Sequence, residues 1–194
     1  SPLSGRHNVL NALACLAAGR LHGLSGEQMQ RGLETFRGIR RRMEVRGEER
    51  GVTVIDDFAH HPTAIATTLE GAHRRYPGRR VWALFEPRSI SSARKEFEDG
   101  YIDAFHHADR VVIGKVFHRG RYESRYGLEN MMSVPRIVDR LNADGIPAMQ
   151  MDDVETIADA VARNAQPGDV VIVMSSGAFD GVHEKLLQRL APAS

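Results

Sequence analysis

The hydrophobic pattern changes character about forty residues into the chain. Before that point, apolar residues recur at helical spacing, which predicts one helix over residues 7–20 and a second from Ser25. Gln28 follows Ser25 at the spacing of a capping box, and Gly38 is expected to end the second helix. Each helix has an apolar stripe and no further element to cover it, so we interpret the pair as the tail of a preceding domain.

After this region, short apolar runs alternate with amphipathic segments. The runs are Val52–Ile55, Val81–Phe85, Val111–Ile113, Ala148–Met151 and Val170–Met174, and the helical segments contain Ile65, Val134, Val154 and Val182. Such alternation predicts a Rossmann-like, doubly wound α/β fold with a mostly parallel sheet. Met43–Arg46 is expected to add an antiparallel edge strand. The predicted domains are residues 1–43, from the end of a preceding domain, and residues 44–194.

Composition excludes several classes of function. The 194 residues are 42% hydrophobic, and 26 Lys and Arg face 25 Asp and Glu, so no basic excess points to nucleic acid or a membrane surface. No apolar run is long enough to span a membrane, and no signal peptide is recognisable. The single cysteine, Cys15, excludes a disulfide framework and is expected to be a buried thiol. The chain begins with Ser1 rather than Met, which suggests a piece of a longer protein.

Three polar segments follow predicted strands. They are Asp56–Pro62, Glu86–Ser89 and Ser175–Gly181. In doubly wound sheets, ligands bind at the carboxyl ends of the strands. We therefore expect the three segments to form one site.

The segment around Asp56, Asp57, His60 and His61 has three interpretations. His and carboxylate side chains so close in sequence are typical of zinc or manganese sites. Alternatively, they cap a helix beginning at Pro62, and one carboxylate is a hydrogen-bonded residue of the core. We favour a third interpretation, in which a carboxylate accepts ribose hydroxyls and a histidine holds a substrate group.

Further residues suggest nucleotide and acceptor contacts. Arg40–Arg42 is either a solvated surface run or a phosphate contact, because guanidinium groups match phosphate oxygens. Asn8 and Asn11 share a helix face and either cap the helix or bind a purine edge. Arg88 is suited to clamping a carboxylate. The turn at Ser175–Gly177 either binds an anion or only serves turn geometry.

Three segments carry a resemblance to a known family. Gly5–Ala14 matches the pattern G-x-H-N-x-x-N-A-L-A, Phe36–Glu44 matches F-x-G-x-x-x-R-x-E, and Asp56–Thr63 matches D-D-[YF]-[GA]-H-H-P-T. In this order and spacing they resemble the Mur ligases over essentially the whole chain. These enzymes are cytoplasmic, use ATP and Mg²⁺ to phosphorylate a carboxylate, and form an amide with an incoming amine.

The resemblance implies roles for individual residues. The expected nucleotide contacts are Asn8 and Asn11 to adenine, Arg42 to the nucleotide and Asp57 to the ribose. The residues expected to face the acceptor are His60, Arg88, Ser175 and Ser176. The phosphate-binding loop, G-x-x-x-x-G-K-[ST], is absent from these residues, so ATP and Mg²⁺ are expected to bind mainly to upstream domains of the same chain. The isolated chain is therefore expected to be inactive.

Two departures narrow the resemblance within the family. Phe85–Ser92 lacks the His-Arg pair and the following Arg of the alanine-adding members, and Met174–Gly181 lacks their Gly-Ala-Gly-Asp type of turn. Both resemble members that join UDP-N-acetylmuramate to the murein tripeptide L-alanyl-γ-D-glutamyl-meso-diaminopimelate in peptidoglycan recycling. The small residues Ser89–Ser92 leave room for a tripeptide. The alternatives are an alanine-adding ligase, a non-catalytic nucleotide-binding module and a small metallohydrolase.

Overall fold

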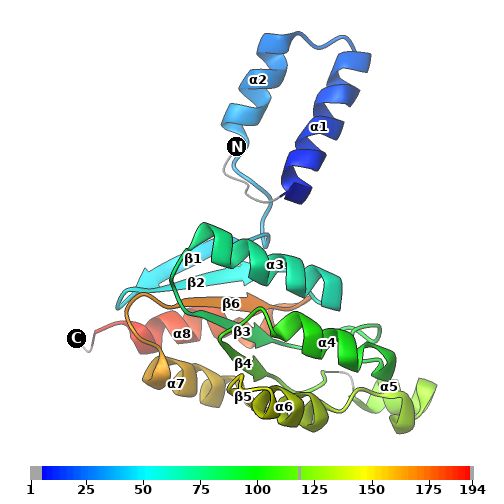
Figure 1. Cartoon of the computed structure of the whole chain (residues 1–194), viewed down its shortest axis with the longest axis vertical. Coiled ribbons are helices and arrows are strands. Elements are labelled where there is room, and N and C mark those ends of the chain that lie inside the picture. The colour runs from blue at the N-terminus through cyan, green and yellow to red at the C-terminus, as the bar shows by residue number, and fades with distance from the viewer. Residues whose placement is uncertain (1–5, 118, 193–194) are drawn as a thin grey trace. The chain divides into compact units, whose positions relative to one another are not determined.

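The computed structural model describes residues 6–117 and 119–192 and divides the chain into two compact units, 1–42 and 43–194. In the first unit, α1 (Arg6–Leu21) and α2 (Gly26–Thr35) form a helical hairpin (Figure 1). The predicted capping box is present, because Gln28 N donates to Ser25 Oγ at 3.2 Å and Ser25 N donates to Gln28 Oε1 at 2.8 Å. The second helix ends at Thr35, before Gly38, so its predicted end was late.

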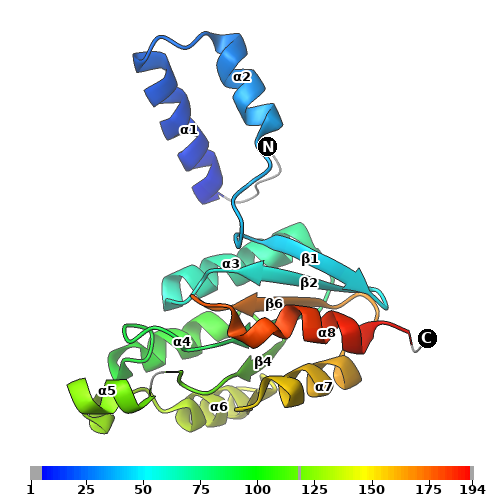
Figure 2. The ribbon, with the colours of Figure 1, turned by 180° about the vertical axis from the view of Figure 1, so that it is seen from behind.

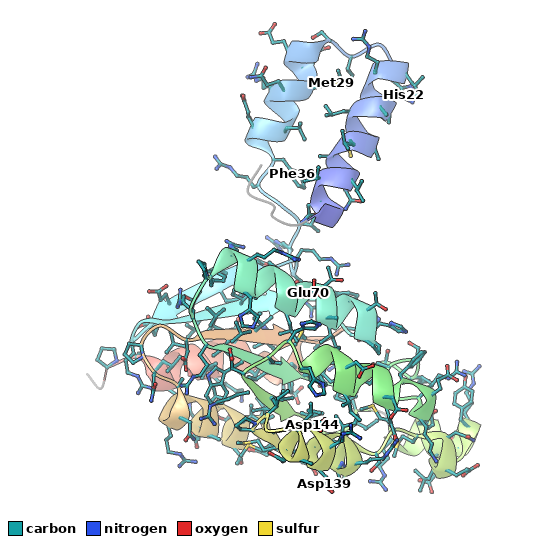
Figure 3. All side chains as sticks on the ribbon, in the orientation of Figure 1. His22, Met29, Phe36, Glu70, Asp139 and Asp144 are labelled. Carbon is teal, nitrogen blue, oxygen red and sulfur yellow. The ribbon has the colours of Figure 1, made fainter. Side chains whose placement is uncertain are left out.

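The helices of the first unit approach each other closely at Gly19. A methyl group there would lie 3.1 Å from the sulfur of Met29, which Figure 3 marks on α2. A two-helix hairpin buries only a narrow strip of each helix. Leu10 and Leu13 are accordingly 54% and 56% exposed. Cys15 is also exposed, so the prediction of a buried thiol is wrong for the described residues.

The second unit is built on a six-stranded sheet of order β1-β2-β6-β3-β4-β5 (Figures 1 and 2). The strands are β1 (Glu44–Glu49), β2 (Val52–Asp57), β3 (Val81–Phe85), β4 (Arg110–Ile113), β5 (Ala148–Gln150) and β6 (Val170–Met174). Only the hairpin of β1 and β2 is antiparallel, and every other pair is parallel. The predicted fold class and the predicted edge strand are confirmed.

Helices cover both faces of this sheet. Side chains of α3 (Pro62–Arg75), α4 (Glu98–Phe105) and α6 (Val134–Ala143) share one buried cluster, and those of α7 (Val154–Asn164) and α8 (Val182–Leu190) share the other. The helix α4 was not predicted, because it has only eight residues and contains Gly100, which weakens the helical signal. The short, charged helix α5 (Arg119–Tyr126) was also missed, and it lies beyond the carboxyl ends of the strands (Figures 1 and 2).

Alternation along the strands decides which side chains reach each face. On β6, Val170, Ile172 and Met174 pack with the cluster of α3, α4 and α6, whereas Val171 and Val173 pack with that of α7 and α8. Successive side chains of a strand point to opposite faces of the sheet. Neighbouring polar residues at a strand end are therefore separated in the same way.

Asp169 directly precedes β6, at the amino ends of the strands and away from the carboxyl ends that carry the predicted site. Its carboxylate is buried and structural. It accepts hydrogen bonds from Arg80 Nη2 at 2.6 Å, Trp82 Nε1 at 2.8 Å and the Gln166 amide at 2.9 Å. Burial by itself would raise the pKa of Asp169, but its bonds to Arg80, Gln166 and Trp82 hold that pKa below the ordinary 3.8.

We expect Asp169→Ala to lower the free energy of unfolding by about 2–3 kcal/mol at neutral pH, because charged hydrogen bonds are lost. A depressed pKa stabilises the fold above the unfolded value and loses that effect as pH falls through the folded value. The difference between variant and parent should therefore shrink below about pH 4. Urea unfolding at neutral and acidic pH measures it. Asp159→Ala is the control, because its ion pair with Arg189 is exposed and should matter little.

Candidate functional site

The polar segments predicted to converge do lie side by side. Strands β2, β6 and β3 are neighbours in the sheet, and Asp57, Met174 and Phe85 are in register at their ends. The prediction of a shared edge is confirmed. A fourth segment, 114–117, leaves the end of β4 beside β3 and was missed, although the same strand-end rule would have found it.

The Arg88 side chain is held from several sides at this edge. Its guanidinium carbon lies 3.8 Å from the centre of the Phe117 ring, which is a cation–π contact. Its Nη1 lies 3.5 Å from a carboxylate oxygen of Glu86. A methyl group on Gly177 would lie 2.0 Å from Arg88 Nε, so the glycine leaves room for the guanidinium in this position. The Arg88 side chain is still 27% exposed and can reach a ligand.

A buried carboxylate lies beneath this arginine. Glu86 is only 3% exposed, and its Oε2 accepts a hydrogen bond of 2.5 Å from Ser175 Oγ. The same Ser175 oxygen accepts the Gly177 amide at 2.9 Å. Ser175 thus links Glu86 to the turn under Arg88. For its hydroxyl to contact a bound substrate, these hydrogen bonds would have to be exchanged. Ser176 is half-buried beside it. Sequence reasoning placed Glu86 in one of the converging segments without giving it a role, and it missed Phe117.

The Asp57 carboxylate is buried and accepts several hydrogen bonds. Its Oδ2 accepts the Met43 amide at 2.8 Å, and its Oδ1 accepts the Ala59 amide at 2.8 Å and the Thr68 hydroxyl at 3.2 Å. Only 3% of Asp57 is exposed. These contacts fit the alternative of capping and core satisfaction that the sequence left open. The expected contact with a ribose stays a prediction.

The Asp-His cluster does not assemble as a metal site. Asp56 faces the other side of the sheet from Asp57, where its carboxylate lies 3.4 Å from His183 Nε2. His61 is exposed, and its ring contacts Phe97 edge-on. Within residues 6–117 and 119–192, no group of three or more His, Cys, Asp or Glu could hold a metal ion. The Asp-His cluster that suggested a metallohydrolase is therefore not assembled among the described residues.

His60 and Tyr101 connect two of the converging segments. His60 is half-buried, and its Nδ1 lies 2.9 Å from the Phe58 carbonyl, which can only accept a hydrogen bond. The buried Tyr101 hydroxyl lies 2.9 Å from both the His60 and Ser92 carbonyl oxygens. Burial raises the pKa of Tyr101 well above its ordinary 10, so the hydroxyl remains a donor. Tyr101 was not predicted from the sequence.

In a complete ligase of the kind that the sequence resembles, we expect Tyr101→Phe to loosen the two segments and raise the acceptor KM about three- to tenfold, equivalent to about 1 kcal/mol for one hydrogen bond. The half-buried Tyr76, on the end of α3, provides the control Tyr76→Phe. Steady-state kinetics with varied acceptor would measure the effect. An unchanged KM together with a lower melting temperature would make Tyr101 a core residue only.

The predicted nucleotide contacts are divided between the two units. Asn8 is half-buried and Asn11 exposed on α1, and Arg42 is an exposed residue at the end of the first unit. Asp57 belongs to the second unit. Each unit is defined by itself, so the joint nucleotide site stays a prediction.

Comparison with known proteins identifies the family. A model of the Mur ligase glutamate ligase domain matches residues 41–177. The chain belongs to the Mur ligase family. Among the described residues of this Mur ligase chain, no helix is both long and apolar enough to cross a bilayer.

Similar Mur ligases differ in their named acceptors. The UDP-N-acetylmuramate–L-alanyl-γ-D-glutamyl-meso-2,6-diaminoheptandioate ligase of Escherichia coli (strain K12) is 39% identical over 191 residues, covering 97% of this chain and 38% of that protein. The UDP-N-acetylmuramate–L-alanine ligase of Desulfitobacterium hafniense (strain Y51) is 35% identical over 185 residues, covering 95% and 40%. A murein peptide ligase structure from Psychrobacter arcticus 273-4 has a TM-score of 0.73 at 34% identity, covering 99% and 38%. The chain thus spans about two fifths of these relatives.

Proposed function

We propose that this chain is the acceptor-binding part of an ATP-dependent ligase that joins UDP-N-acetylmuramate to L-alanyl-γ-D-glutamyl-meso-diaminopimelate. The observation that carries the proposal is the single, firmly seated Arg88 at the shared strand edge. Its fork of donors fits one carboxylate of an incoming peptide. The similarity to a ligase named for this tripeptide supports the same acceptor.

In this proposal the residues of the chain bind and orient the acceptor. Arg88 holds a carboxylate, while Glu86 and Phe117 keep the guanidinium in place. His60 and Ser176 border the position of the reacting amine, and Ser175 fixes the turn. The amide forms when this amine attacks the activated muramate carboxyl carbon and the carboxyl's leaving group departs.

Mg²⁺ and the phosphates of ATP are proposed to bind mainly to upstream domains of the complete ligase. In support, the described residues contain no group of three or more His, Cys, Asp or Glu that could hold a metal ion, and the sequence has no phosphate-binding loop motif. Asn8 and Asn11 are proposed to contact the adenine of ATP, Arg42 the nucleotide and Asp57 the ribose. We therefore expect the isolated chain to form no amide.

An L-alanine acceptor is the second candidate, because two relatives named as UDP-N-acetylmuramate–L-alanine ligases are 35% and 37% identical to this chain. The test is amide formation by the complete ligase with ATP, UDP-N-acetylmuramate and either acceptor. We expect efficient turnover of the tripeptide and little with L-alanine. Turnover of L-alanine alone would refute the tripeptide proposal, and amide formation by the isolated chain would show that these residues suffice.

A further inference from the structure

A groove lies between the segments that follow β3 and β4. Its charged and aromatic lining is formed by Arg94, Lys95, Glu96, Tyr122, Arg125 and Tyr126. Its volume of about 740 Å³ lies within the range of small-molecule sites, about 300–1,000 Å³. One wall is the connection from β3 to α4, and the other is α5, beyond the carboxyl ends of the strands (Figures 1 and 2).

The groove adjoins the Arg88 site along the chain, because its lining includes Ile90 and Ser91, two and three residues after Arg88. At the Arg88 end, the Phe117 amide donates to the Pro87 carbonyl at 3.1 Å, and the Phe117 ring lies against Arg88. Farther along the same two segments, Arg94 and Met131 pair as an isolated antiparallel β-bridge. A ligand anchored on Arg88 can therefore extend into the groove.

The charges of the groove are arranged for a zwitterion. Its lining holds three cations, Arg94, Lys95 and Arg125, and one carboxylate, Glu96. Arg94 Nη2 lies 2.7 Å from Glu96 Oε2, and these side chains are 52% and 51% exposed. An ion pair this exposed contributes little to stability, so its members can turn to a ligand at small cost.

Aromatic side chains supply an apolar flank beside these charges. Tyr126 is 44% exposed, and the Arg125 guanidinium lies 5.4 Å from the centre of its ring. The Tyr122 ring is buried, and its hydroxyl donates to the Asn130 carbonyl at 2.8 Å, which ties α5 to the following turn. The groove thus offers a charged end and a surface for a methylene chain.

We propose that this groove is the subsite for the diaminopimelate residue of the acceptor peptide. The inference rests on the proposed tripeptide ligase function. One amine of meso-diaminopimelate forms the amide bond to the peptide, so the residue keeps two carboxylates and one ammonium. This ammonium and one of the carboxylates lie on the α-carbon farther from the peptide, the distal carbon. Glu96 binds that ammonium, Arg94 binds the adjacent carboxylate, and Arg125 binds the proximal carboxylate. The Tyr126 ring covers the methylene chain between the two carbons.

The test compares three acceptors in the complete ligase. They are the natural tripeptide, the tripeptide with L-lysine in third place, and the dipeptide L-alanyl-γ-D-glutamate. The lysine peptide keeps the distal ammonium but lacks the distal carboxylate. Arg94→Ala should raise the KM for the diaminopimelate peptide about tenfold, as for one charged hydrogen bond, and leave the other two within about twofold. Arg74→Ala is the control, because Arg74 is exposed on α3, where it forms an ion pair with Glu70, the residue labelled in Figure 3.

The outcomes separate this inference from the proposed function. If the tripeptide is a substrate but Arg94→Ala changes the KM of all three acceptors equally, or of none, the subsite assignment is wrong and the function stands. If the complete ligase uses L-alanine and not the tripeptide, both proposals fail. Selective loss of the diaminopimelate peptide, with a melting temperature like that of the control, supports the subsite.

Discussion

In the complete ligase, Arg88→Ala is expected to raise the KM for the peptide acceptor about 10- to 100-fold and leave the KM for ATP nearly unchanged. A carboxylate held by a forked guanidinium loses one or two charged hydrogen bonds of about 1.5–3 kcal/mol, and each 1.4 kcal/mol is a factor of ten. Arg88→Lys should rescue only part of the loss, because a point charge replaces a two-pronged donor. Kinetics with varied acceptor and varied ATP measure both constants.

Gly177→Ala tests the same contact while leaving the arginine in the chain. The new methyl group would meet the Cδ, Nε and Cζ atoms of Arg88 at 2.0–2.5 Å, so the guanidinium must leave its place over Gly177. We expect a rise in acceptor KM that approaches that of Arg88→Ala, with little loss of stability, because a flexible side chain can move. Gly71→Ala on α3 is the control, since a methyl group there meets no atom within 4 Å.

Different results would change the assignment of Arg88. Equal losses for ATP and acceptor in Arg88→Ala, or mainly a lower melting temperature, would show that Arg88 is structural. The placement of the acceptor pocket would then be wrong, and with it the basis of the tripeptide proposal.

The edge on which this pocket lies was predictable from the sequence. Parallel strands connected by crossover helices present their carboxyl ends on one side, so polar segments that follow them must gather there. The neighbours of Arg88 were not predictable in the same way. Glu86 lies in a segment that the sequence placed at this edge, but its role depends on Ser175, 89 positions away, being on the adjacent strand end. Phe117 belongs to segment 114–117, and its apolar ring gave no signal of a binding role in the sequence.

The groove also escaped prediction, for a reason of local structure. Its walls are α5 and the turn after β3, and both are short elements without a clear apolar period. Their arrangement depends on long-range contacts, such as Glu98 Oε1 accepting the Ser133 amide at 2.7 Å. Periodicity identifies elements that bury a continuous stripe, and it carries little information about segments held by individual hydrogen bonds.

Asp57→Ala is expected to affect both stability and nucleotide binding. Removing the carboxylate leaves the Met43 and Ala59 amides without their acceptor, which should lower the free energy of unfolding by about 2–4 kcal/mol. Met43 directly follows Arg42, a predicted nucleotide contact, so we expect the loss also to affect the backbone next to this arginine. Together with any lost ribose contact, this should raise the KM for ATP about tenfold or more in the complete ligase.

Thr68→Val separates the two consequences of losing Asp57. It removes one hydrogen bond to Asp57 Oδ1 and leaves the bond from the Met43 amide to Oδ2 in place. We therefore expect a small loss of stability, of about 1 kcal/mol, and an unchanged KM for ATP. Urea unfolding and ATP kinetics on both variants measure these effects. A folded Asp57→Ala ligase with an unchanged KM for ATP would make Asp57 a capping residue alone, because neither the ribose contact nor the link to Arg42 would then influence the nucleotide.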